Sequence, residues 1–103
     1  MDLKEYFSCK MTKSREIRQK ILKIMDLALK ISPPDRERKL GETVVFVEYS
    51  AHCPALSVRV YIHGWNEKNG PDKAFWMLTF REDEFEQLNE IIEYLQDLRE
   101  AKQ

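Results

Sequence analysis

The sequence predicts an α+β fold of order α-β-β-β-α, in which a three-stranded antiparallel meander carries two helices packed on one face. Two amphipathic stretches, with apolar residues every three or four positions, flank three short segments rich in β-branched and aromatic residues. The connections between these segments are too short for a crossover helix, so we expect antiparallel strands. We expect one compact domain over residues 1–103, with residues 1–12 of uncertain structure.

The first helix is predicted over residues 14–31. Its apolar face repeats at spacings of four and three, through Ile17, Ile21, Ile24, Ala28 and Ile31. Pro33 and Pro34 end the helix because neither has an amide hydrogen to donate.

The strands are predicted over residues 43–50, 56–63 and 74–80. In the second strand, apolar residues alternate with a polar and aromatic set. We expect the apolar set to face the helices and the other set, which includes Arg59, Tyr61 and His63, to face outward. In the first strand, Glu48 marks the outer face and places Phe46 on it.

The third strand is apolar on both faces, so alternation alone does not orient it. We interpret Trp76 as a core residue, which assigns Phe75 and Met77 to the outer face. An exposed sheet face with this many aromatic side chains is typical of an interface. The predicted partner-binding residues of this face are Phe46, Arg59, Tyr61, His63, Phe75 and Met77.

This face favours a small protein-interaction module that self-associates through it as a homodimer, or that binds another protein there. An alternative is that residues 3–7, or the 64–73 loop with Trp65, fold over the face and hide it. For Trp65 itself, packing against the end of the hairpin is favoured over a role as an exposed binding anchor. Stacking of single-stranded nucleic acid on the aromatic residues and Arg59 is the third possibility.

The second helix is predicted from about residue 82 to about residue 101, and it carries an acidic stripe. The stripe contains no Lys or Arg between Arg81 and Arg99, and it consists of Glu82, Glu86, Glu90, Glu93, Asp97 and Glu100. A solvated face is the simpler interpretation. The more specific interpretation is an acidic inhibitor or regulator that docks this helix on a basic, nucleic-acid-handling protein.

Charge is divided unevenly along the chain. Residues 1–41 carry 11 basic against 6 acidic groups, and residues 42–103 carry 6 against 12. The element order is shared with the double-stranded-RNA-binding domain. That family, however, needs lysines at the start of its second helix, where this chain has Glu82, Asp83 and Glu84. These carboxylates would repel a duplex, so the resemblance to that family stops at topology, and we expect a protein partner ahead of a nucleic acid.

No catalytic, cofactor or metal motif is present in the sequence. His52 and Cys53 lie in the first hairpin turn, and His63 lies about 20 Å or more away along the second strand, so the three are not expected to share an ion. We predict a non-catalytic protein without cofactor or metal. Cys9 and Cys53 are expected to be free thiols, and with no secretory signal and no membrane-length apolar window the expected location is cytoplasmic.

Overall fold

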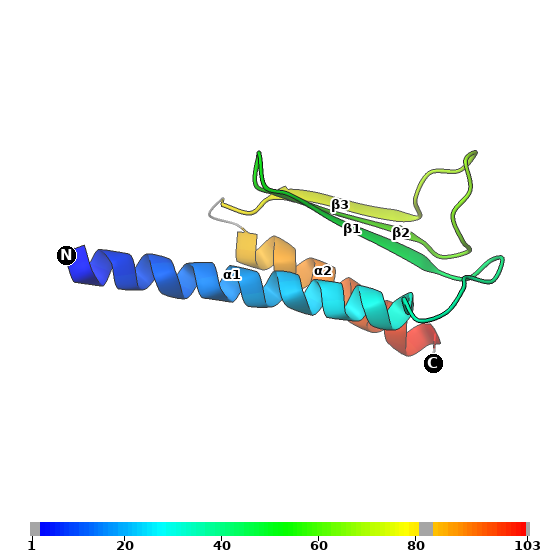
Figure 1. The fold of residues 1–103 in the computed structure, drawn as a ribbon, viewed down its shortest axis with the longest axis horizontal. Coiled ribbons are helices and arrows are strands. Elements are labelled where there is room, and N and C mark those ends of the chain that lie inside the picture. The colour runs from blue at the N-terminus through cyan, green and yellow to red at the C-terminus, as the bar shows by residue number, and fades with distance from the viewer. Residues whose placement is uncertain (1–2, 81–83, 103) are drawn as a thin grey trace.

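The computed structural model describes residues 3–80 and 84–102, and the side chains of 14–80 and 84–101. It contains α1 (Leu3–Ile31), β1 (Val44–Ser50), β2 (Ala55–Tyr61), β3 (Lys73–Leu78) and α2 (Glu84–Lys102), as Figure 1 shows. The three strands form an antiparallel sheet of order β1-β2-β3, with the helices packed against it. The predicted α+β fold is therefore confirmed.

Both helices run in the same direction along one face of the sheet (Figure 1). In the sequence, three antiparallel strands connect α1 to α2. Because their number is odd, α2 starts at the same end of the molecule as α1. The core lies between the two layers and draws on every element except β1, with Ile24, Leu27, Leu56, Val58, Val60, Met77, Leu88, Ile91 and Leu95 all buried. Val45 and Val47 of β1 pack at its margin.

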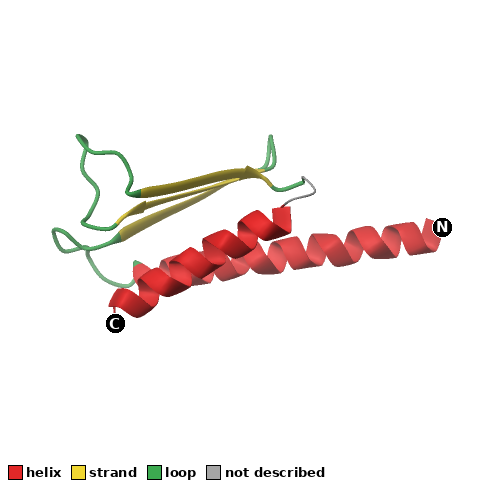
Figure 2. Cartoon of the chain, turned by 180° about the vertical axis from the view of Figure 1, so that it is seen from behind, coloured by secondary structure: helices red, strands yellow, loops and turns green. Residues whose placement is uncertain are grey.

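The α1 helix begins 11 residues earlier than predicted, at Leu3 rather than Ser14. No glycine or proline interrupts residues 3–13, so nothing in the local sequence stops the helix. The first third of α1 projects past the sheet and past α2 (Figures 1 and 2). The backbone of residues 3–7 therefore does not fold over the outer sheet face.

The C-terminal end of α1 is tied to the sheet by hydrogen bonds. Ser32 Oγ donates to the carbonyl of Thr43 at 3.0 Å and accepts from the amide of Val45 at 3.2 Å. Thr43 Oγ1 in turn donates to the carbonyl of Ile62 at 2.8 Å. These bonds satisfy backbone groups at the start of β1, the edge strand above α1.

Two loops meet closely at the same end of the sheet. Gly41 and Gly64 have φ of 86° and 96°, a region that residues with a side chain rarely adopt. A Cβ added to Gly64 would lie 3.3 Å from the backbone of Gly41. Glycine at position 64 therefore allows the 62–72 loop to pack against the segment that precedes β1.

The prediction of which β3 side chains face away from the helices was wrong. Trp76 lies opposite Ser57, and Ala74 lies opposite Arg59, so Trp76 shares the outer face with these residues of β2. Phe75 and Met77 lie on the helix-covered face. Met77 is 3% exposed, and the Phe75 ring packs edge-on against Tyr94 of α2 with centroids 5.6 Å apart.

The end of the second strand also differs from the prediction. β2 ends at Tyr61. The next amide, that of Ile62, donates a hydrogen bond to the Asp72 carboxylate at 2.7 Å instead of to a neighbouring strand. His63 is therefore an exposed turn residue and does not lie on the sheet face.

Candidate functional site: the outer sheet face

The outer sheet face consists of the residues whose side chains point away from the helices. Residues directly opposite each other in an antiparallel pair share a face, so the register defines the set. Its members are Val44, Phe46, Glu48, Ser50, Ala55, Ser57, Arg59, Tyr61, Ala74, Trp76 and Leu78. Neither α1 nor α2 covers this face (Figures 1 and 2).

An aromatic and cationic cluster lies on β1 and β2. The Phe46 and Tyr61 rings meet edge to face with centroids 5.5 Å apart, and the Arg59 guanidinium carbon lies 5.1 Å from the Phe46 centroid. Phe46 and Arg59 are cross-strand partners, which explains the contact. A cation above an aromatic ring is attracted to its negative face, so the Arg59 side chain is held in place on the sheet.

Trp76 stands next to this cluster on β3 and is the most exposed aromatic residue of the face. It is 65% exposed and pairs with Ser57, the residue two before Arg59. Our sequence interpretation missed it because β3 is apolar on both faces. The only signal that could have placed it is the register with β2, which depends on the geometry of the 62–72 loop.

One end of the face is bordered by the 62–72 loop. Trp65, 54% exposed, lines an open groove of about 550 Å³ with Val44 and Phe46. The loop rises on the side of the sheet away from the helices (Figure 1). It therefore borders the outer face at this end, while Trp76 and Leu78 lie toward the other.

The opposite wall of that groove is an ordered, charged segment. Glu42 accepts hydrogen bonds from the Lys39 amide at 3.2 Å and from the Arg36 guanidinium at 3.0 Å. The Lys39 bond, followed by the hydrogen bond from Arg36, lowers the pKa of Glu42 below its usual value. The carboxylate thereby fixes the loop that leads into β1.

Of the six residues predicted for this face, the structure brings three together. Phe46, Arg59 and Tyr61 form the cluster described above. Phe75 and Met77 lie on the opposite face, and His63 lies in the turn after β2. Tyr61 is itself only 6% exposed, so Phe46 and Arg59 present most of the cluster to solvent.

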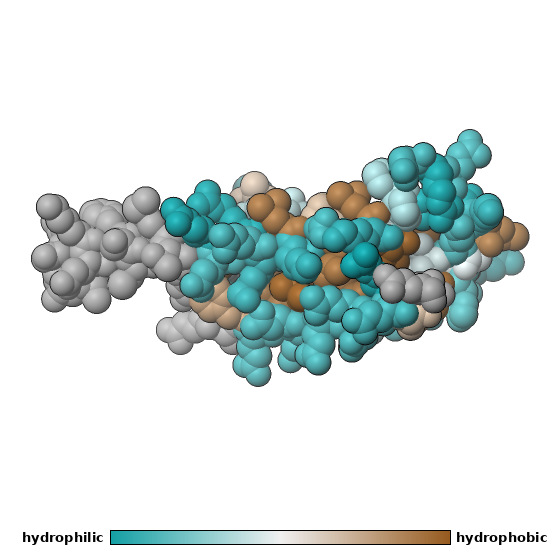
Figure 3. Space-filling model, turned by 90° about the horizontal axis from the view of Figure 1, so that it is seen from below, coloured by the Kyte–Doolittle hydropathy of each residue, from teal (hydrophilic) through white to brown (hydrophobic). Residues whose placement is uncertain are grey.

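The acidic stripe of α2 faces solvent as predicted. The exposed members are Glu86, Glu90, Glu93, Asp97 and Glu100, whereas Glu82 lies outside the described residues. None of the five forms an ion pair with another described side chain. Lys20 of α1 instead donates a hydrogen bond to Asn89 of α2 at 2.6 Å. Figure 3 views the molecule from the helix side and shows hydrophilic residues on either side of a band of hydrophobic ones.

The described part of the chain offers few other candidate functional groups. Among these residues no group of three His, Cys, Asp or Glu side chains is placed to hold a metal ion. Cys53 is a free, exposed thiol in the β1–β2 turn. No described helix combines the length and apolar character needed to cross a bilayer.

Comparisons with known proteins give no independent guide. No family model matches the chain, and neither the curated proteins nor the solved structures contain a match.

Proposed function

We propose that this protein is a small, non-catalytic, cytoplasmic protein-interaction module that binds its partner through the outer sheet face. The observation that supports this most directly is the exposed Trp76 beside the Phe46–Arg59–Tyr61 cluster. Trp, Tyr and Arg are the residue types that contribute most to binding at protein interfaces.

The face is also partly ordered before any partner binds. Arg59 is held over Phe46, and Phe46 packs on Tyr61, so these side chains have less conformational freedom to lose on binding. Less binding energy is therefore spent on ordering these three side chains.

The corrected orientation of β3 affects the choice of partner. With Phe75 and Met77 on the covered face, the outer face carries Glu48, Ser57 and Arg59 as well as aromatic residues. Permanent homodimers have more apolar interfaces than this, whereas mixed polar and aromatic surfaces suit separable partners. We therefore expect a separate protein partner, with self-association through this face as the alternative.

The test compares two equally exposed hydrophobic residues. Trp76→Ala removes the proposed anchor, while Leu22→Ala on α1 removes a side chain of 67% exposure outside the face. A partner captured by the wild-type protein should bind Trp76→Ala roughly 30-fold more weakly, equivalent to about 2 kcal/mol, and bind Leu22→Ala normally. NMR titration should place the largest shifts at Phe46, Arg59 and Trp76.

Two results would contradict the proposal. One is a partner whose affinity is unchanged by Trp76→Ala and Arg59→Ala. The other is a titration whose shifts lie elsewhere on the molecule. A wild-type homodimer that Trp76→Ala dissociates would support the face as an interface and identify the partner as a second copy.

The exposed acidic row of α2 supports a second candidate function, docking on a basic protein that handles nucleic acid. Five exposed carboxylates without ion pairs among the described side chains give one flank of the molecule a single sign. Affinity for such a partner should fall as salt rises, and should fall again in the triple variant Glu86→Gln, Glu90→Gln, Glu93→Gln. An affinity indifferent to both changes rejects this function.

A further inference from the structure

The free edge of β3 presents backbone hydrogen-bonding groups. Along an antiparallel strand, successive residues point their N–H and C=O groups toward one neighbouring strand and then toward the other. The Val60 carbonyl accepts from the Asp72 amide, so the even-numbered residues of β2 bond toward β3. The register then directs the backbone groups of Ala74, Trp76 and Leu78 away from β2, at the edge where the described sheet ends. An added strand would find donors and acceptors in place there.

A groove of about 270 Å³ lies between this edge and α2. Its lining comes from β3 and α2 and consists of Ala74, Phe75, Trp76, Met77, Gln87, Glu90 and Ile91. None of the described residues of β2 or α1 lines it, so it opens on the side of β3 that faces away from the rest of the sheet. Met77 and Ile91 are buried and give the groove an apolar floor, whereas Trp76 and Glu90 are exposed at its rim.

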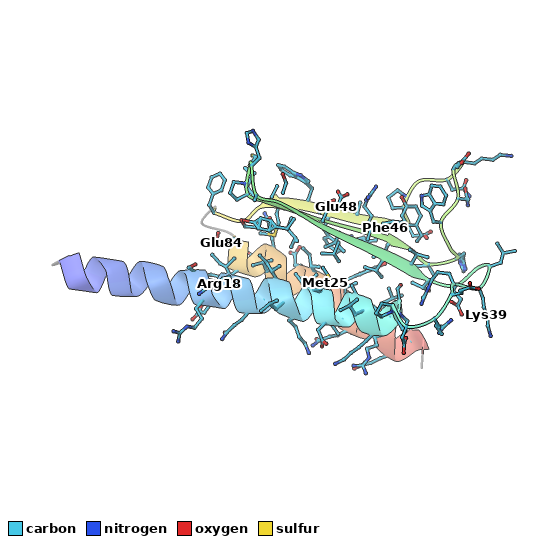
Figure 4. All side chains as sticks on the ribbon, in the orientation of Figure 1. Arg18, Met25, Lys39, Phe46, Glu48 and Glu84 are labelled. Carbon is cyan, nitrogen blue, oxygen red and sulfur yellow. The ribbon has the colours of Figure 1, made fainter. Side chains whose placement is uncertain are left out.

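The other edge of the sheet, at β1, is less available. Ser32 Oγ binds the Val45 amide and the Thr43 carbonyl there. Figure 4 shows Met25 of α1 on the helix side of the sheet, below β1, and Glu48 of β1 on the opposite side. Because two backbone groups at the start of β1 are already bonded, one end of this edge is closed to an added strand.

Charge selects the kind of segment that fits the β3 edge. Glu90 lines the groove and belongs to the exposed acidic row of α2, which forms no ion pair with another described side chain. Glu86 and Glu93 lie about one turn to either side of it. The one basic residue of β3, Lys73, lies at the start of the strand with its ammonium over aromatic rings of β3 and α2. The groove is therefore suited to a Lys or Arg side chain.

A second copy of this chain fits the edge poorly. The Phe75 ring packs against Tyr94, so α2 lies beneath β3. Two β3 edges joined in one sheet would therefore bring two α2 helices side by side, each with five exposed carboxylates. Like charges at such a contact repel, so charge favours a basic segment of a different protein.

We propose that the β3 edge binds an extended, basic segment of the partner protein as a fourth strand of the sheet. This rests on the proposed function, since it takes the protein to be an interaction module, and it adds the conformation and the charge of the bound segment. Successive side chains of a strand point to opposite faces. Those on the helix side meet Glu90, and those on the outer side lie beside Trp76. The segment therefore carries Lys or Arg at alternate positions, with apolar residues between them.

A synthetic peptide of alternating Lys and Val residues tests the added strand. On titration with this peptide, NMR should show the amides of Ala74, Trp76 and Leu78 shifting and exchanging more slowly with solvent, because each gains an acceptor. The amides of Val47 and Tyr49, on the β1 edge, are internal controls and should not change. A peptide of the same composition, with Lys and Val in separate blocks, should bind at least about 10-fold more weakly.

Two variants test the edge and the charge separately. Ala74→Pro removes one edge donor and leaves the ladder to β2 intact, so it should weaken binding of the alternating peptide about 10-fold. Ala74→Val keeps the amide and should bind normally, and circular dichroism should report the same fold for both. Glu90→Lys should weaken binding by about 10-fold or more. Asp97→Lys, the same charge change outside the groove lining, should weaken it less.

N-methylation of the peptide tests the same hydrogen bonds and leaves the protein unchanged. One peptide carries the methyl groups on the amides of its Lys residues, and the other carries them on the amides of its Val residues. Only one of these two sets faces β3 in a paired strand. One methylated peptide should therefore lose binding while the other retains it. Equal behaviour of the two would overturn the proposal.

Three further results would overturn it. They are absence of peptide binding at low salt, binding unaffected by Ala74→Pro, and slow exchange of the edge amides without peptide, which would mean that a second copy already occupies the edge. The proposed function fails separately. A partner weakened by Arg59→Ala but not by Ala74→Pro leaves the outer sheet face as the interface and rejects the added strand. The reverse result supports the added strand and rejects the outer sheet face.

Discussion

Trp76 and Met77 are neighbours in β3 with opposite environments. Trp76 is 65% exposed and Met77 is 3% exposed, because successive residues of a strand point to opposite faces. A tryptophan left this exposed gains little from folding, whereas the buried methionine contributes most of its apolar surface to the core. The larger side chain is thus the smaller contributor to stability.

Alanine substitutions at these two positions should show the difference. Met77→Ala removes a buried side chain and leaves a cavity, so it should lower the free energy of unfolding by about 2–5 kcal/mol. Trp76→Ala should lower it by less than about 1 kcal/mol, because surface substitutions generally have small effects. Equilibrium urea denaturation measures both. A larger loss for Trp76→Ala would contradict the orientation of β3 described above.

The sequence could not supply this orientation. In β2 the alternation of apolar residues with Ser57, Arg59 and Tyr61 identifies the covered face. In β3 both alternating sets are apolar, so the pattern is the same whichever face is covered. The orientation is set instead by two backbone bonds at the ends of the β2–β3 pair, Asp72 amide to Val60 carbonyl and Thr79 amide to Pro54 carbonyl. These depend on loop conformations that local sequence does not determine.

Ser32 joins two secondary-structure elements, the end of α1 and the start of β1. Its hydroxyl donates to one backbone group of the edge strand and accepts from another. Ser32→Ala should therefore lower the free energy of unfolding by about 1–3 kcal/mol, since it leaves partly buried backbone groups without their partners. Ser50→Ala, at the exposed end of β1, is the matched control and should change little. Equal effects in the two variants would show that the link is not stabilising.

The elements themselves were largely predictable. The strand bounds differ from the predicted ones by at most two residues, because β-branched and aromatic runs end at clear turn signals. The start of α1 was missed by 11 residues. Lys10 and Ser14 interrupt the apolar face there, so periodicity weakens although nothing breaks the helix. This weaker stretch is the segment that extends beyond the sheet.

The shape of the protein follows from the unequal helices. The principal extents are 57, 27 and 22 Å, and the longest dimension runs along the axis of α1. The outer sheet face and the exposed acidic row of α2 lie on different sides of the molecule, so one copy has room for both proposed interfaces.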